Sequence, residues 1–203
     1  MPRSRGRPWH CPTRLRSWAN SMSSGPSGLA ERTVEEAETA LVFCIPEADA
    51  RISRWRDRYD PSAAEGVPAH VTVAVPFLPH RDFLEAQDRV SAIIGRMSAF
   101  DVVFLELHRF PGTLWLKPEP SEPIRKLSAQ IVEAFPDYPL YGGAFREIIP
   151  HLTVAQGNEE LLDRLVPELS PILETPIRSR ITGCTVFVHG PGRWRAIKQF
   201  PLQ

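Results

Sequence analysis

The sequence contains little cysteine and no long apolar segment. Three of its 203 residues are cysteines, and Cys11, Cys44 and Cys184 lie far apart, without the short spacings of a metal site. This pattern argues against a disulfide framework or a zinc knuckle, and it favours a reducing, cytoplasmic location. Because no apolar stretch reaches about 18 residues, the sequence predicts no transmembrane helix and no membrane partner.

Acidic residues are absent from the first 30 positions, which contain five arginines. The rest of the chain contains 19 basic and 24 acidic residues and is therefore mildly acidic. A mildly acidic domain is a poor match for bulk electrostatic binding of duplex nucleic acid. A local basic pocket for a single phosphate remains compatible with this balance.

The N-terminal segment also differs in composition from the rest of the chain, because it is rich in Arg, Ser and Pro. We interpret residues 1–37 as a disordered extension and residues 38–203 as one folded domain. The absence of acidic residues also suits a transit peptide. The plainer interpretation is an upstream extension, with Met22 nearer to the natural start.

Strand and helix patterns follow one another in the folded part without a strict βαβ rhythm. This mixture predicts an α+β fold with mainly antiparallel sheets. Helical spacing of apolar residues indicates helices over residues 49–59, 81–97, 121–135 and 159–169. Apolar and β-branched runs indicate strands over residues 40–45, 69–76, 101–110, 113–117, 181–188 and 193–200, with one more around His151.

A histidine, an apolar residue and a threonine occur in this order twice, each time after a proline and within a β-branched run. The first copy is His70-Val71-Thr72-Val73 and the second is His151-Leu152-Thr153-Val154. In an extended strand, residues i and i+2 share a face. His70 is therefore expected beside Thr72, and His151 beside Thr153, with the intervening apolar residues facing a core.

Each of these strands is followed by a helix of similar pattern, which suggests an internal duplication. We therefore expect a bilobal molecule with two pseudo-twofold-related lobes, helices outside, and a central cleft lined by both motifs. A twofold arrangement places one imidazole on each side of a substrate. Because histidine titrates near pH 6.5, one ring can act as base while the other acts as acid. The threonine hydroxyls can donate hydrogen bonds to phosphate oxygens.

The two motifs and their flanks resemble the 2H phosphoesterase superfamily, and within it the 2′-5′ RNA ligase-like and 2′,3′-cyclic phosphodiesterase proteins. The resemblance covers about residues 38–202 and implies a bilobal α+β fold and no metal or organic cofactor. It implies His70 and His151 as catalytic residues, with Thr72 and Thr153 binding the phosphate. The flanks that contribute are Pro76-Phe77, Arg109-Phe110-Pro111-Gly112, Tyr141-Gly142-Gly143 and the closing Trp194 to Leu202.

Aromatic and basic residues near the motifs are further candidates for substrate contact. Phe77, Tyr141 and Phe145 could stack on a base, although ordinary core or loop positions are the favoured interpretation for aromatic side chains. Arg146 lies near His151 in the sequence and could contact phosphate, or it could be an ordinary solvated arginine.

The leading functional hypothesis is a metal-independent phosphodiesterase that opens 2′,3′-cyclic phosphates to 2′-phosphates, with reversible 2′-5′ RNA ligation as a related activity. RNA ends or nucleoside cyclic phosphates are its expected substrates, and a monomer is the expected state. One alternative is a non-catalytic module that binds nucleotides or RNA ends with the same residues. Another is a metallohydrolase that uses the histidines as ligands.

Overall fold

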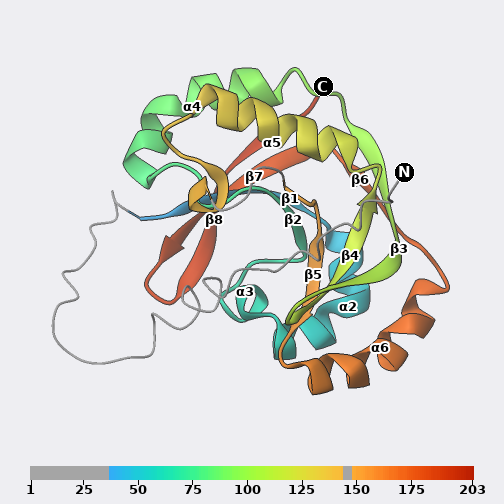
Figure 1. The fold of residues 1–203 in the computed structure, drawn as a ribbon. Coiled ribbons are helices and arrows are strands. Elements are labelled where there is room, and N and C mark those ends of the chain that lie inside the picture. Colours follow the sequence, from blue (N-terminus) through green and yellow to red (C-terminus); the bar gives the residue numbers. More distant parts are fainter. Residues whose placement is uncertain (1–36, 144–147) are drawn as a thin grey trace, which may run out of the picture. The chain divides into compact units, whose positions relative to one another are not determined.

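The computed structural model describes residues 37–143 and 148–203, which form strands and helices in mixed order (Figure 1). The strands are β1 (Thr39–Cys44), β2 (His70–Ala74), β3 (Phe100–Phe110), β4 (Thr113–Glu119), β5 (Leu152–Gln156), β6 (Ile177–Ile181), β7 (Gly183–Gly190) and β8 (Arg193–Pro201). The helices are α2 (Pro46–Tyr59), α3 (Pro61–Ala64), α4 (His80–Ile94), α5 (Glu122–Ala134) and α6 (Glu159–Leu173), with a 3-10 turn at Leu140–Gly143.

The strands form two four-stranded sheets in which every neighbouring pair is antiparallel. One sheet has the order β2-β1-β7-β8 and the other has the order β5-β4-β3-β6. The predicted α+β class with antiparallel sheets is therefore confirmed.

The two sheets have corresponding topologies. The succession β1-α2-β2 in one is matched by β4-α5-β5 in the other, and each histidine motif belongs to an edge strand beside the strand that precedes the helix. The helices are exchanged between the halves, because α2 packs against β5 and β6 whereas α5 packs against β2. This exchange brings the two motif strands into contact.

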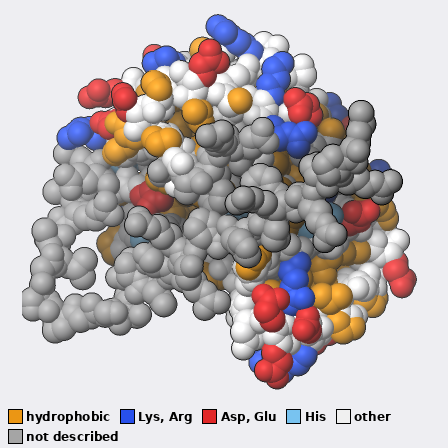
Figure 2. All heavy atoms as spheres, in the orientation of Figure 1, with side chains coloured by type: hydrophobic (Ala, Val, Ile, Leu, Met, Phe, Trp, Pro, Cys, Tyr) orange, Lys and Arg blue, Asp and Glu red, His pale blue; other side chains and the backbone are white. Residues whose placement is uncertain are grey.

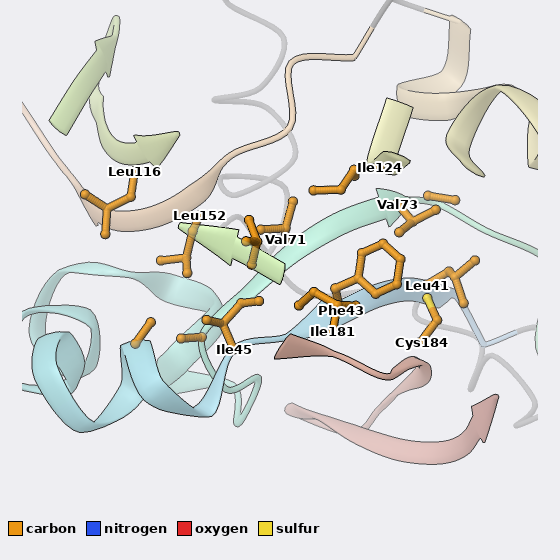
Figure 3. Close-up of a cluster of buried hydrophobic side chains, with 14 of the residues drawn as sticks. Leu41, Phe43, Ile45, Val71, Val73, Leu116, Ile124, Leu152, Ile181 and Cys184 are labelled. Atoms are coloured by element: carbon orange, nitrogen blue, oxygen red, sulfur yellow. The ribbon is translucent and has the colours of Figure 1, made fainter. Parts of the chain in front are cut away.

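One continuous apolar core joins the two sheets (Figure 3). Phe43 and Val71 enter it from the first sheet, and Leu116 and Leu152 enter it from the second. Full burial of an aliphatic or aromatic side chain contributes about 1.5–3 kcal/mol. The alternation predicted for the motifs is confirmed, since the residues between and after the His and Thr positions are buried: Val71, Val73, Leu152 and Val154.

Helix α2 begins earlier than the apolar spacing predicted, at Pro46 instead of residue 49. A proline at the first helical position costs no hydrogen bond, and acidic residues in the first turn, here Glu47 and Asp49, favour a helix start. Ala48, Ile52 and Trp55 then form the buried stripe. Trp55 donates a hydrogen bond to Glu168 of α6, and Arg51 donates one to the carbonyl oxygen of Thr175, just after α6.

Three further features differ from the sequence expectations. Strand β6 was not predicted, because its five residues alternate between buried and exposed positions and provide only a short apolar signal. Helix α6 continues to Leu173, past the predicted end at residue 169, with Pro167 and Pro171 inside it. Ser121 stands at the predicted start of α5, but its side chain makes no capping hydrogen bond.

None of the described helices has the length and apolar character needed to cross a membrane. The expectation of a disordered extension falls almost entirely on residues 1–36, which lie outside the described part of the chain.

Candidate functional site

The first motif lies at the start of β2, on the edge of the first sheet. His70 is paired with Cys44 of β1, and Thr72 is paired with Val42. Both motif side chains are half-buried, whereas Val71 between them is buried in the core. His70 and Thr72 therefore share the face of the sheet that points away from the main core, as the two-residue period predicts.

The second motif occupies the corresponding place in the second sheet. His151 directly precedes β5, and Thr153 is paired with Trp115 of β4. Both motif side chains are again half-buried and flank a buried residue, Leu152. In the described part of the chain, neither threonine hydroxyl makes a hydrogen bond.

Each of the two imidazoles is held by an equivalent local hydrogen bond. Nδ1 of His70 lies 2.8 Å from the carbonyl oxygen of Pro68, and Nδ1 of His151 lies 2.7 Å from that of Ile149. A carbonyl oxygen only accepts, so Nδ1 must carry the proton in both rings. The other nitrogen, Nε2, is then the one that takes up or releases a proton.

The structure brings the two histidines close enough to influence each other. Burial is the main cause that lowers the pKa of His70, and the charges of Arg56 and His151 lower it further. Burial likewise lowers the pKa of His151. The carboxylate of Asp60 acts on both rings in the opposite direction and raises both pKa values. Asp60, at the end of α2, therefore lies near both motifs.

These pKa shifts predict that the protein loses stability as the pH falls below about 6.5. The imidazoles have lower pKa values when folded than in the unfolded chain, so the unfolded state binds more protons. Their contribution is present in full above the unfolded value and decreases as the pH falls through it. Urea unfolding from about pH 7.5 to about pH 5.5 measures the effect. A His70→Gln/His151→Gln variant should show a flatter dependence, and an unchanged dependence would contradict the assignment.

Aromatic rings surround His151. Phe110 and Trp115 lie edge-on to its imidazole, with ring centroids 5.3 and 5.9 Å away. Trp115 is stacked between Phe110 and His108, at centroid distances of 4.6 and 4.7 Å. The indole nitrogen of Trp115 is buried and has no hydrogen-bond partner within the described residues. These ring contacts restrict the orientation of His151.

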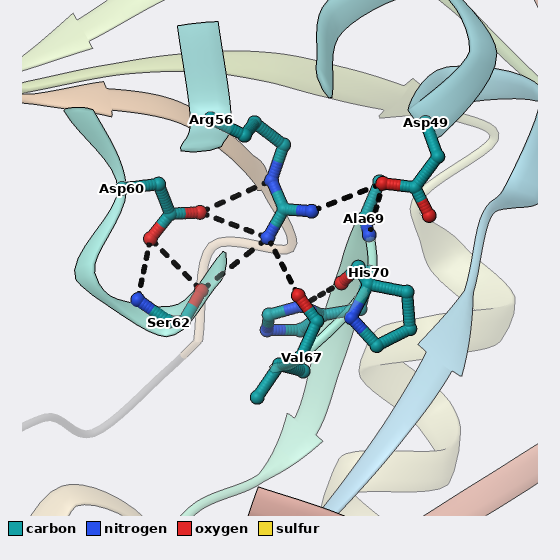
Figure 4. A network of polar contacts seen from close by, with 8 residues as sticks. Asp49, Arg56, Asp60, Ser62, Val67, Ala69 and His70 are labelled. Carbon is teal, nitrogen blue, oxygen red and sulfur yellow. Dashed lines mark hydrogen bonds and ion pairs between the residues drawn. The ribbon is translucent and has the colours of Figure 1, made fainter. Parts of the chain in front are cut away.

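A buried ion pair at the end of α2, Arg56 with Asp60, stands beside His70 and was missed by the sequence analysis (Figure 4). Both side chains are almost fully buried, at 2% and 1% exposure. A signal for this pair was present in the sequence. Arg56 follows Ile52 by four residues on the apolar stripe of the helix, and Asp60 follows Arg56 by four.

The other predicted contact residues are distributed differently. Phe77 lies in the core, where its ring packs edge-on against Phe135, which agrees with the favoured interpretation of this residue as a core aromatic. Tyr141 is half-buried, its backbone N–H donates to Val75, and burial raises its pKa to about 12. Phe145 and Arg146 lie outside the described residues.

On the face shown in Figure 2, charged residues of both signs are interspersed where the surface is described. Arg109, which belongs to a flank of the family resemblance, is engaged by Asp163 at 2.7 Å and by Glu159 at 3.2 Å. In the described ranges, no group of three His, Cys, Asp or Glu residues is placed to hold a metal ion.

The fold thus consists of two antiparallel sheets, each with one histidine-threonine strand at its edge. The family model of the 2′-5′ RNA ligase superfamily matches residues 45–192, and the chain belongs to this family. No curated protein matches the chain at a significant level.

Solved structures of low sequence identity have the same fold. E. coli LigT complexed with 3′-AMP is 19% identical, with a TM-score of 0.58 over 82% of this chain and 98% of that chain. A crystal structure described as a phosphoesterase is 16% identical, with a TM-score of 0.55 over 83% and 99% of the two chains. A protein of Thermus thermophilus, TT0787, is 14% identical, with a TM-score of 0.54 over 81% and 97%.

Proposed function

We propose that the protein is a metal-independent phosphodiesterase that acts on RNA-type phosphoesters and opens 2′,3′-cyclic phosphates to 2′-phosphates. The observation that supports this proposal is that His70 and His151 make the same kind of hydrogen bond to the backbone. Each uses Nδ1 to hold a backbone carbonyl and leaves Nε2 for proton transfer. Such a pair can act as base and acid in the same reaction.

In the proposed reaction, Nε2 of one histidine accepts a proton from water as the water oxygen forms a bond to phosphorus. The bond between phosphorus and the 3′ oxygen breaks on the opposite side, since attack and departure are roughly in line. The second histidine, protonated at Nε2, gives its proton to the departing 3′ oxygen. The first ring ends protonated and the second neutral, and exchange with solvent restores the starting state.

The threonines complete the proposed site. Thr72 and Thr153 share the faces of His70 and His151, and their hydroxyls can donate to the non-bridging oxygens as charge develops there. A 5′-hydroxyl in place of the water would give a 2′-5′ linkage by the same proton transfers. The LigT complex with 3′-AMP supports a nucleotide as the kind of ligand for this fold.

The test is turnover of the four nucleoside 2′,3′-cyclic phosphates and of RNA with a cyclic phosphate end. We expect hydrolysis to the 2′-phosphate at an unchanged rate after EDTA treatment, with chromatography separating the 2′ and 3′ products. Binding without turnover of any substrate would favour the non-catalytic module. Loss of activity in EDTA with recovery by Zn²⁺ or Mn²⁺ would favour the metallohydrolase.

A further inference from the structure

Arg56 is a buried cation whose hydrogen bonds are all made inside the protein. Its Nε and Nη2 donate to the carboxylate of Asp60 at 3.1 and 2.9 Å, and its Nη1 donates to Asp49 at 3.2 Å. Nη2 also lies 3.3 Å from the Ser62 hydroxyl and 3.3 Å from the carbonyl oxygen of Val67. With 2% of the side chain exposed, Arg56 is not available to a phosphate group.

The groups that accept hydrogen bonds from Arg56 contact or belong to the backbone segment just before His70 (Figure 4). Arg56 holds the carbonyl of Val67, and the carboxylate of Asp49 accepts the backbone N–H of Ala69 at 2.8 Å. The carbonyl of Pro68 between them accepts Nδ1–H of His70. The residues on either side of Pro68, Val67 and Ala69, are therefore both fixed by side chains of one helix. Gly66, at φ +92°, makes the turn that leads into them.

We propose that Arg56 is a positioning residue that acts through His70: with Asp49 and Asp60 it fixes the backbone that orients this imidazole. The proposal rests on the proposed function in so far as it concerns the rate. It concerns only one of the two motifs, because the corresponding carbonyl before His151 belongs to Ile149, and the described residues include no arginine bound to that segment.

Arg56 also makes the two histidines electrostatically different. The charged and titratable groups around His70 are Arg56 and Asp60 at the end of α2, Asp49 on that helix, Cys44 on β1 and His151. After burial and the Pro68 hydrogen bond, the charge of Arg56 is the largest influence on the pKa of His70, and it lowers this pKa. Burial lowers the pKa of His151, whereas the hydrogen bond to Ile149 and the carboxylate of Asp60 raise it.

The decisive variants are Arg56→Lys and Arg56→Met, with Arg58→Met as the matched control. Arg58 lies on the same helix but is exposed, so its replacement removes the same charge without touching the network. NMR titration of the histidine rings, with long-range nitrogen spectra to identify the protonated nitrogen, reports on His70 directly. We expect Arg56→Met to raise the pKa of His70 more than that of His151. Arg58→Met should change neither, and equal shifts of the two rings would overturn the electrostatic part of the proposal.

The lysine variant separates position from charge. Lysine keeps the cation beside Asp60 but lacks the planar fork that reaches Asp60, Asp49 and Val67 together. We expect kcat to fall about 10- to 100-fold with little change in KM, because a small displacement of a reacting group has this effect. The pKa of His70 should change less than in Arg56→Met. A kcat equal to that of wild type would overturn the positioning role, and this test stands even if Arg56→Met does not fold.

Failure of the proposed function has a different signature. If the wild-type protein turns over no cyclic phosphate, the proposed function fails. The ring spectra still decide whether Arg56 fixes His70. If His70 in Arg56→Lys keeps the Nδ1–H tautomer and the wild-type chemical shifts, the proposal that Arg56 positions His70 is overturned. A mixed tautomer at His70 and an unchanged His151 would support it.

Discussion

Alanine in place of His70 or of His151 is expected to lower kcat by a factor of about 10²–10⁴, the usual contribution of a positioned acid or base. Each variant removes an Nε2 that transfers one of the two protons in the proposed reaction. Steady-state hydrolysis of a nucleoside 2′,3′-cyclic phosphate measures the loss. His80→Ala is the control, because His80 starts α4 and has no threonine partner, and it should keep wild-type activity.

The pH dependence of the same variants distinguishes the two roles. The wild-type kcat/KM should follow a bell-shaped profile, and burial lowers the pKa values of both histidines, so its maximum should lie on the acid side of about pH 6.5. The variant without the base loses the rising limb, and the variant without the acid loses the falling limb. An unchanged rate in either alanine variant would refute the two-histidine mechanism.

Asp60→Ala is expected to lower the free energy of unfolding by about 3–5 kcal/mol, because it leaves the buried guanidinium of Arg56 without its main partner. Asp60 also accepts the backbone N–H and the hydroxyl of Ser62, so the start of α3 loses its cap. Urea unfolding measures the change. Asp57→Ala, an exposed position on α2, is the control and should change the stability by less than about 0.5 kcal/mol.

A small effect of Asp60→Ala would mean that water or a neighbouring group takes over the carboxylate's place. In that case the ion pair of Arg56 and Asp60 would not be what fixes the Val67–Ala69 segment. Comparing the loss of stability with the loss of activity is informative here, since Asp60 also influences both histidines electrostatically.

Local patterns in the sequence predicted the motif strands well. The two-residue alternation placed His70 with Thr72 and His151 with Thr153 on one face of each strand, and the structure confirms this. Helices with a continuous apolar stripe, such as α4 and α5, were also found within a few residues of their ends. The short strand β6 was not, because five alternating residues provide too little apolar periodicity.

Side-chain environments were predicted less well. Phe77 was a candidate for base stacking because it follows the first motif closely, yet the chain turns it into the core against Phe83 and Phe135. Arg56 was overlooked because a charged residue in a helix is usually exposed. Its burial depends on Asp49, Asp60 and the Val67 carbonyl together, and the spacing of the helix indicates only the pairing with Asp60.

The sequence by itself determined that two strands each carry an imidazole and a hydroxyl on one face, because side-chain direction in a strand follows from the backbone geometry alone. Only the tertiary structure decided that the two histidines come together, that α2 ends beside both, and that one of them stands next to a buried arginine. The exchange of helices between the sheets produces this arrangement. It results from packing between segments far apart in the chain, for which local periodicity contains no information.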